Sequence, residues 1–597
     1  MTAYAFRRDA GEFACDAWRP LDRAVYRWVL AHRGSPLLAK VAAWASLADG
    51  QGDSALPLDG DGARHGMPPL DGDELAHLCA EAMVASDDEA ALRPFVIDGA
   101  NRFYLRRNHA HEARIAECIA LRRDAAESAG GVDEHDLDLL FQGRRDEAVQ
   151  AQREAVARVV GRRLFVLTGG PGTGKTTTVL RMLAMLQRCS PQPLTMRAAA
   201  PTGKAAQRLV DALRQGRERL LTDPGTPLPA DWRDSLQSLP DREALTLHRL
   251  LGYDPQRNAF RRTRRNPIAA DVVVIDEASM IDLAMLRALL DAVPAHARLI
   301  LVGDADQLTS VAAGSALMDL VAAMEARPRG DLVRLRYSFR AERHLVDINE
   351  AVRMGDAAAL EAAIDAAGLY AARQVVETPA HATAELVRWA TRLAGLESLR
   401  GTACAEGAEA ARAALDALGR LQLLCALRDG PFGAIHASRV IEQHLRRAWG
   451  HPDGVEWYPG RAVMITHNDY AMRLFNGDVG VCLAGPDGHL RVWFESAGDA
   501  AGLREFAPGA LPPNVTAFAV TVHKSQGSEY ERVAVLLPPD ADHRILSRQL
   551  LYTGVSRARD AVEIWAGDGP LAAALARPVQ RNGGLADRLE RSDLSPG

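Results

Sequence analysis

A glycine-rich segment, GGPGTGKT at residues 169–176, carries the most specific chemical pattern in this 597-residue sequence. It follows an apolar run at 164–168 and precedes a helical pattern, which is the strand–loop–helix order in which G-x-x-x-x-G-K-[ST] binds phosphates. Backbone amides of such a loop point at the phosphates, and the amino end of the helix adds partial positive charge. We expect Lys175 to reach the β- and γ-phosphates of a nucleotide, and Thr176 to place its hydroxyl on Mg²⁺. The predicted nucleotide-binding residues of this loop are Gly169, Gly170, Pro171, Gly172, Thr173, Gly174, Lys175, Thr176 and Thr177.

Acidic and amide side chains follow two further apolar runs. The run at 271–277, DVVVIDE, ends in Asp276, which is expected to hold Mg²⁺ directly or through water, and Glu277, which would polarise the attacking water. The alternative is an acid pair that only caps a helix. The run at 298–304 continues as GDADQL, where Gln307 is suited to sensing the γ-phosphate and a plain turn is the alternative. Because parallel strands end at the same sheet edge, these side chains should gather beside the glycine loop.

Lysine is scarce, with only four residues among the 71 basic ones, so each lysine position is informative. None lies in the N-K-x-D pattern that a GTPase needs to read its base. Lys204 (in AAAPTGKAAQRL, 198–209) and Lys524 (in VTVHKSQGSEY, 520–530) instead lie in small polar loops that follow strand-like runs. Such loops can contact the phosphates of a nucleic-acid strand, although for each lysine a solvated surface charge is the alternative.

Alternating strand-like and helical patterns around the glycine loop predict a doubly wound α/β fold with a parallel sheet. Runs at 462–469, 477–485 and 489–495 alternate as antiparallel strands do, which predicts a small β insertion in a second α/β domain. The predicted domains are an N-terminal domain at 1–115, a first motor domain at 116–334, a second at 335–479 and 516–597, and the β insertion at 480–515.

Composition limits the remaining possibilities. The net charge of −6 gives no global basic field, so a nucleic-acid site must be a local groove. The arginine cluster RRTRR at 261–265 could contact DNA or a partner, but a solvated charge run is the favoured interpretation. No signal-peptide pattern or 18-residue apolar run occurs, which indicates a cytoplasmic protein. The seven scattered cysteines contain no C-x-x-C, which argues against a disulfide framework, a zinc site or an iron–sulfur cluster.

Taken in order, these segments resemble the motifs of superfamily 1 helicases. The matching segments are Gln152, GGPGTGKTTT (169–178), APTGKAAQRL (200–209), TLHRLLG (246–252), VVIDEASMID (273–282), VGDADQLTSVAAG (302–314), LRYSFR (335–340), VHKSQGSEY (522–530) and YTGVSRAR (552–559). More narrowly, the chain resembles the RecD family, the alpha subunits of exodeoxyribonuclease V (RecBCD). This narrower resemblance also includes WRPLD (18–22), SLADGQG (46–52), RFYLRR (102–107), RDGPFG (428–433) and LFNGDVG (474–480).

The resemblance implies an architecture and further site residues. It implies two RecA-like P-loop motor domains with parallel sheets, an SH3-like β insertion and a mainly helical N-terminal domain that binds partners. Gln152 resembles the adenine-reading glutamine, and Arg340 and Arg557 would reach the γ-phosphate from the second motor domain. DNA would be tracked through phosphate contacts by Thr202, Lys204, His523 and Lys524.

The resemblance also implies an activity, which is ATP-dependent 5′-to-3′ DNA helicase and translocase action in a heterotrimer with RecB-like and RecC-like subunits. Such a complex acts on single-stranded DNA and duplex ends without sequence preference, in double-strand break repair, homologous recombination and degradation of linear DNA. A stand-alone RecD-like helicase is the alternative, although its helix-hairpin-helix extension is not found; an ATP-binding subunit with a vestigial motor is disfavoured by the complete motifs. Nuclease activity is expected in a partner chain, because the unassigned Lys40 has no acid beside it.

Overall fold

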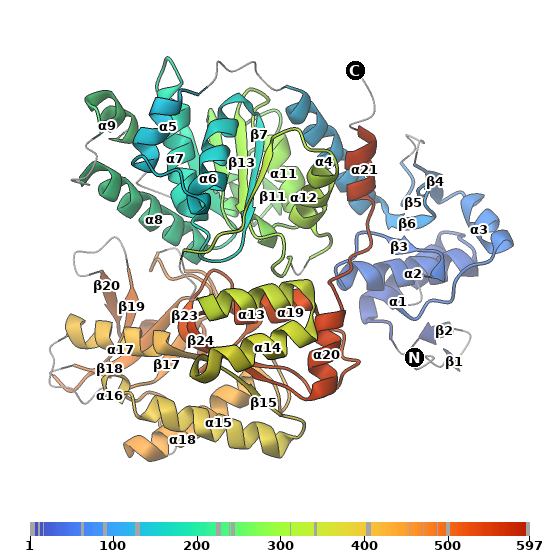
Figure 1. The fold of residues 1–597 in the computed structure, drawn as a ribbon. Coiled ribbons are helices and arrows are strands. Elements are labelled where there is room, and N and C mark those ends of the chain that lie inside the picture. Colours follow the sequence, from blue (N-terminus) through green and yellow to red (C-terminus); the bar gives the residue numbers. More distant parts are fainter. Residues whose placement is uncertain are drawn as a thin grey trace.

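A computed structural model describes residues 6–592, except for 10–11, 16, 61–64, 88–91, 126–131, 223–227, 238, 240–244, 311, 340–342, 401–406, 453, 470, 486 and 497–501. Two parallel sheets form the centre of the molecule, one above the other in Figure 1, and the N-terminal region lies to their side. None of the helices in these described ranges is long and apolar enough to cross a membrane.

The first sheet has six parallel strands and carries the glycine loop. Its order is β14-β7-β13-β12-β8-β9. The strands are β7 (Leu164–Gly169), β8 (Met196–Ala200), β9 (Leu245–Thr246), β12 (Val272–Ile275), β13 (Arg298–Gly303) and β14 (Leu332–Leu335). Every residue of β7 and β12 is buried, which explains their continuous apolar sequence.

Helices cover both faces of this first sheet, as Figure 1 shows. Val272 and Val274 of β12 pack with the helices of one face, whereas Val273 and Ile275 pack with those of the other. One face has α5 (Glu134–Phe141), α6 (Glu147–Arg158), α7 (Lys175–Arg188), α8 (Gly203–Thr222) and α9 (Ala230–Gln237). The other face has α4 (Arg106–Asp124), α10 (Leu247–Leu250), α11 (Leu283–Ala292) and α12 (Ala316–Ala326). The predicted doubly wound parallel fold is confirmed.

The second sheet has five parallel strands in the order β15-β24-β23-β16-β22. They are β15 (Ala371–Gln374), β16 (Leu421–Cys425), β22 (Ala519–Thr521), β23 (Tyr530–Leu536) and β24 (Ala558–Trp565). The surrounding helices are α13 (Arg343–Met354), α14 (Ala357–Ala367), α15 (Pro379–Ala394), α16 (Glu397–Arg400), α17 (Ala408–Arg420), α18 (Ala434–Trp449), α19 (Arg548–Val555) and α20 (Asp568–Ala576). The chain therefore contains two RecA-like units, which we call the first and second motors.

A five-stranded antiparallel sheet interrupts the second motor. It consists of β17 (Ala462–Ile465), β18 (Val479–Ala484), β19 (Leu490–Glu495), β20 (Leu503–Phe506) and β21 (Asn514–Thr516). The sheet is larger than the predicted insertion of 480–515, because β17 pairs with both β18 and β21 and so forms part of it. It has a small core of its own, which includes Val463, Cys482 and Phe494.

The N-terminal region combines helices with a small sheet. Its elements are β1 (Phe6–Asp9), β2 (Glu12–Cys15), α1 (Pro20–Ala31), α2 (Pro36–Gly50), β3 (Leu56–Pro57), α3 (Gly72–Cys79), β4 (Val84–Ser86), β5 (Phe95–Ile97) and β6 (Arg102–Leu105). Helix α4 continues from this region into the first motor without a break at the predicted boundary of residue 115, and its residue Arg123 pairs with Asp331 at 2.7 Å. One continuous helix thus belongs to both the N-terminal region and the first motor.

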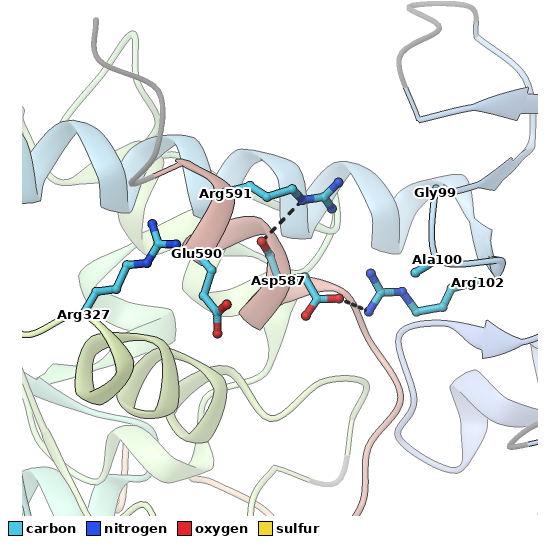
Figure 2. A pocket seen from close by; sticks show the side chains of 7 residues that line it. All are labelled: Gly99, Ala100, Arg102, Arg327, Asp587, Glu590 and Arg591. Atoms are coloured by element: carbon cyan, nitrogen blue, oxygen red, sulfur yellow. Dashed lines mark hydrogen bonds and ion pairs between the residues drawn. The ribbon is translucent and has the colours of Figure 1, made fainter.

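The end of the chain joins these parts. Residues 577–592, here called the C-terminal strap, leave α20 of the second motor and finish in α21 (Leu585–Ser592). Leu585 and Leu589 of α21 are buried among residues of α4 and α12. A pocket of about 320 Å³ lies where α21, the end of α12 and the β5–β6 turn meet. Figure 2 shows the side chains that line it. It is lined by Gly99, Ala100, Arg102, Arg327, Asp587, Glu590 and Arg591.

Candidate active site

The glycine loop lies between β7, which ends at Gly169, and α7, which begins at Lys175. The Lys175 ammonium donates to the carbonyl oxygens of Gly169 (2.7 Å) and Gly170 (2.9 Å). Gly174 has a φ of 80°, and a Cβ there would lie 2.5 Å from Nε2 of Gln152. The loop therefore needs glycine at position 174. It also holds the Lys175 ammonium on the carbonyl oxygens of Gly169 and Gly170, which phosphate oxygens can replace.

Two carboxylates lie at the same edge of the sheet. Burial and the charge of Glu277 raise the pKa of Asp276, and Lys175 acts in the opposite direction. Burial also raises the pKa of Asp304, again against the effect of Lys175. Glu277 adopts a left-handed φ of 52°, and its amide donates to Asp276 Oδ1 at 2.9 Å. Asp304 is buried and Asp276 is half-buried, and a hydroxyl–carboxylate donor set of Thr176 and Asp276 fits Mg²⁺.

Gln307 and Arg557 are brought together across the two motors. Arg557 Nη2 donates to Gln307 Oε1 at 2.5 Å, and Gln307 Nε2 donates to Asp304 Oδ2 at 2.9 Å. The Tyr552 hydroxyl donates to the same Asp304 oxygen at 3.2 Å, and a Cβ on Gly170 would lie 2.9 Å from that hydroxyl. The second motor therefore places Tyr552 beside the glycine loop and Arg557 beside Gln307.

Backbone contacts reinforce this boundary between the motors. The amide of Leu308 donates to Thr553 Oγ1 at 2.8 Å, and Nε2 of Gln526 donates to the carbonyl oxygen of Leu308 at 3.0 Å. Leu308, the neighbour of Gln307 in sequence, thus contacts two segments of the second motor.

The side of the loop away from the acids contains aromatic and amide groups. Gln152 is 4% exposed, its Nε2 donates to the Thr173 carbonyl at 3.0 Å, and Arg181 donates to its Oε1 at 3.2 Å. The amide of Phe339 donates to the Gly172 carbonyl at 2.9 Å. Phe339 is 42% exposed and Tyr337 is 55% exposed, and the centroids of their rings lie 5.0 Å apart. This arrangement offers a stacking surface beside Gln152.

Sequence reasoning missed several of these groups. Tyr337 and Phe339 stand in the segment LRYSFR, which was selected only for Arg340; Arg340 itself lies outside the described residues. Tyr552 begins YTGVSRAR, in which the sequence predicts a role for Arg557 alone. In both segments the signal is an aromatic residue in a polar stretch, but its partner lies far away in the sequence, at Gly172 for Phe339 and at Asp304 for Tyr552.

The predicted DNA-contacting residues lie on both motors. Thr202 accepts from the Ala205 amide at 3.2 Å at the start of α8. Burial and the charge of Arg208 lower the pKa of Lys204 to about 8, while Asp478 of the antiparallel sheet acts in the opposite direction. A Cβ on Gly203 would lie 2.4 Å from Cγ of Phe475, so this loop contacts the antiparallel sheet directly.

The second pair of predicted DNA contacts has different neighbours. His523 and Lys524 form a single 3₁₀ turn, Val522–Ser525, after β22. Burial and the charge of Arg428 lower the pKa of Lys524, and burial and the charge of Arg581 lower that of His523. Lys524 is exposed, as a contact to a phosphate backbone requires, whereas His523 is half-buried near the C-terminal strap.

The arginine cluster at 261–265 follows a short hairpin of β10 (Tyr253–Asp254) and β11 (Ala259–Phe260). Arg261 pairs with Asp254 at 3.3 Å, and Arg262 donates to the Pro267 carbonyl at 3.2 Å. Part of the cluster thus stabilises its own turn, and the whole cluster is exposed.

Known protein families match one part of each motor. Residues 152–313 match the AAA domain family, and residues 516–564 match the UvrD-like helicase C-terminal domain. The chain is 41% identical over 461 residues to the RecBCD enzyme subunit RecD of Mycobacterium tuberculosis (strain ATCC 25618 / H37Rv), covering 76% of this chain and 75% of that protein. It is 39% identical to the RecBCD enzyme subunit RecD of Mycolicibacterium smegmatis, covering 81% and 82% of the two chains.

More distant similarities extend to other helicases. The chain is 30% identical to the ATP-dependent RecD2 DNA helicase of Deinococcus radiodurans, covering 77% of this chain and 55% of that protein. Among solved structures, Bacteroides Pif1 bound to ssDNA is 14% identical with a TM-score of 0.36, covering 70% of this chain and 92% of that one.

Proposed function

The chain belongs to the RecD family of superfamily 1 ATP-dependent DNA helicases, and from this premise we propose that it is the 5′-to-3′ motor subunit of a RecBCD-type helicase–nuclease complex. The observation that carries the proposal is the buried contact between Gln307 of the first motor and Arg557 of the second. A hydrogen bond that joins the two motors beside the nucleotide loop can couple ATP hydrolysis to relative movement of the motors.

We propose the following roles at the nucleotide site. Lys175 exchanges its two loop carbonyls for phosphate oxygens, and the loop amides bind the same phosphates. Thr176 and Asp276 would hold Mg²⁺, which neutralises phosphate charge when it is bound. Glu277 orients the attacking water, and Gln307 senses the terminal phosphate. Gln152 selects adenine, with the Phe339 ring beside it as a stacking surface.

Arg557 and Arg340 would act from the second motor. A guanidinium stays charged at any relevant pH, and it stabilises transferring phosphate only when the motors close around it. Contact of Arg557 with Gln307 supports this role, because it brings the charge to the boundary at which closure takes place.

DNA would pass over both motors. We assign phosphate contacts to Thr202 and Lys204 on the first motor and to His523 and Lys524 on the second. Contacts to phosphate rather than to bases make tracking independent of sequence, as a translocase requires. Action on chromosomal DNA in repair and recombination would place the protein in the cytoplasm.

We further propose RecB-like and RecC-like partner subunits, with the nuclease in a partner chain and the N-terminal region at 1–115 forming partner contacts. Support comes from the names of the relatives at 39–41% identity, which are subunits of RecBCD enzymes. A stand-alone helicase is the second candidate, and the 30% identity to RecD2 of Deinococcus radiodurans favours it less.

Strand polarity tests the proposed motor. We expect the purified wild-type chain, with ATP and Mg²⁺, to unwind duplexes that carry a 5′ single-stranded tail and not those that carry a 3′ tail. Lys175→Ala should abolish both unwinding and DNA-stimulated ATP hydrolysis without changing the fold by circular dichroism. Unwinding of 3′-tailed duplexes would refute the polarity, and hydrolysis by Lys175→Ala would refute the assigned phosphate site.

A further inference from the structure

The C-terminal strap runs from one motor to the other along the N-terminal region (Figure 1). Its first residues are held by α19 of the second motor, where the Arg548 amide donates to the Arg577 carbonyl at 2.8 Å and the Val579 amide donates to Gln549 Oε1 at 2.6 Å. Helix α19 also carries Tyr552 and Thr553, which contact the first motor beside the glycine loop. The strap therefore starts from the same helix that contacts the nucleotide site.

Arg581 of the strap holds the loop that follows Gln307. Its Nη1 donates to the carbonyl oxygens of Ala312 (2.5 Å) and Gly314 (2.9 Å), and its Nη2 donates to that of Ser310. A guanidinium has five donors in a rigid fork, so one side chain can fix several carbonyls of an irregular loop at once. Ser310 lies three residues after Gln307, and the position of this loop therefore depends on Arg581.

Gly52 of the N-terminal region completes the Arg581 site. Arg581 Nη1 donates to its carbonyl at 3.3 Å, and the Gly314 amide donates to the same oxygen at 2.9 Å. Gly52 has a φ of 97°, and a Cβ there would lie 2.8 Å from Cζ of Arg581. Glycine at the end of SLADGQG is thus required both by the backbone conformation and by the close approach of the guanidinium.

The strap is fixed in place by the N-terminal region beyond Arg581. The Ser54 amide donates to the Asn582 carbonyl at 2.9 Å, and the Gly584 amide donates to Glu112 Oε2 at 3.1 Å. A Cβ on Gly584 would lie 2.4 Å from the buried hydroxyl of Tyr104. Figure 2 shows the next contact, in which Asp587 points toward Arg102 at 2.6 Å.

We infer that Arg581 is a positioning residue for ATP hydrolysis. It acts on Gln307 through Ser310 and the residues between them, and it makes the placement of Gln307 depend on the docking of the strap to the N-terminal region. This inference rests on the proposed role of Gln307 at the γ-phosphate. Three contacts hold the strap in place. They are with α19 at its start, with the loop after Gln307 at Arg581, and with the N-terminal region at Gly584. Any partner that shifts the N-terminal region would therefore change the hydrolysis step.

Steady-state ATP hydrolysis at saturating single-stranded DNA tests the inference. We expect Arg581→Ala to lower kcat about tenfold with KM for ATP nearly unchanged, because a sensor displaced by a fraction of an ångström loses transition-state contacts rather than ground-state binding. Arg581→Lys keeps a charged donor and should recover part of the rate. The matched control is Arg591→Ala, an exposed arginine of the same strap whose guanidinium lies 3.9 Å from Asp87. An unchanged kcat in Arg581→Ala would overturn the inference, whereas inactive wild-type protein would instead refute the proposed function.

A second variant separates positioning from simple loss of stability. Gly584→Ala leaves Arg581 intact but displaces the strap from Tyr104, and it should lower kcat to a similar extent. Combining Gly584→Ala with Arg581→Ala should then cost little more than either change alone, since both act through the same contact. Rates are measured below each variant's melting midpoint. A lower midpoint with an unchanged kcat, or fully additive losses in kcat, would show a structural role only and overturn the inference.

Discussion

Arg557 carries a permanent charge although the residue is only 3% exposed. Its guanidinium donates to Gln307 of the first motor and, at 3.0 Å, to the Thr553 carbonyl of its own motor. A charge held at a closing boundary stabilises the transition state more than bound ATP. We expect Arg557→Ala to lower kcat of DNA-stimulated hydrolysis by about 10³-fold. A fluorescent ATP analogue should bind with an affinity changed by only a few-fold.

The neighbouring Arg559 provides the control for this variant. It is exposed and pairs with Glu529 at 2.9 Å, so it has the same chemistry two residues away without reaching the first motor. Arg559→Ala should hydrolyse ATP at nearly the wild-type rate. Equal losses in the two variants would show that positive charge in this segment, rather than the position of Arg557, determines the rate.

The sequence predicts those site residues that lie within recognisable local patterns. Asp276 directly follows the buried strand β12, and Lys175 follows β7 after the short glycine loop, so the parallel sheet brings both to one edge. Tyr552 and Arg581 could not be predicted in the same way. Their contacts join residues 248 and 267–271 positions apart, and no local periodicity reports which carbonyl or carboxylate a distant side chain will meet.

The antiparallel sheet contacts the first motor at Gly203. A Cβ on Gly203, at the start of α8, would lie 2.4 Å from Cγ of Phe475 in the loop before β18. Gly203→Ala should therefore push the sheet away from the loop that carries Lys204. We expect the affinity for single-stranded DNA to fall about fivefold, because ordered contacts along the strand are lost. Fluorescence anisotropy with labelled oligonucleotides measures this change.

A compensating substitution tests the steric cause. Gly203→Ala combined with Phe475→Ala removes the ring that the new methyl group would meet, and the DNA affinity should recover toward that of Phe475→Ala alone. Lack of any recovery would show that Gly203 matters for the backbone conformation of its loop and not for docking of the sheet.

Asp319 of α12 gives a pH prediction. Burial raises the pKa of its carboxyl to about 7, although Ser315 donates to it at 2.9 Å. Between about pH 4 and pH 7 the folded protein therefore keeps a proton that the unfolded chain has released, so stability falls as pH rises through this window. Asp319→Asn retains an oxygen that accepts from Ser315 and carries no charge. We expect it to melt about 2 °C higher than wild type at pH 8, with the difference vanishing near pH 4.

The exposed Asp542 is the control for this pH effect. Its side chain is 96% exposed, so Asp542→Asn should leave the melting temperature unchanged at both pH values. Identical behaviour of the two variants would mean that overall charge, and not burial of Asp319, sets the pH dependence.

Some element boundaries could be predicted from sequence and others could not. The strands β7, β12 and β13 were evident because their apolar runs are continuous and short. Strand β17 was evident as a strand, but its sheet was not, since pairing with β18 and β21 is set by tertiary contacts. Helix α4 likewise crosses the expected domain boundary because its apolar residues pack on the first motor.

The whole molecule has a motor architecture, and we expect it to work together with partner chains that supply the nuclease. In the described part of this chain, Arg557 and Tyr552 of the second motor meet Gln307 and the glycine loop of the first, and the C-terminal strap joins both motors to the N-terminal region. We expect co-expression with RecB-like and RecC-like chains of the same organism to give one complex with equal amounts of the three chains by size-exclusion chromatography. That complex should degrade linear duplex DNA with ATP and Mg²⁺, whereas this chain alone should not.

Lys175→Ala in this chain should leave assembly intact and slow unwinding from 5′-tailed ends, because it removes a phosphate ligand and no partner contact. Degradation of DNA by the isolated chain would contradict the assignment of the nuclease to a partner, and failure of the three chains to co-elute would favour a stand-alone helicase.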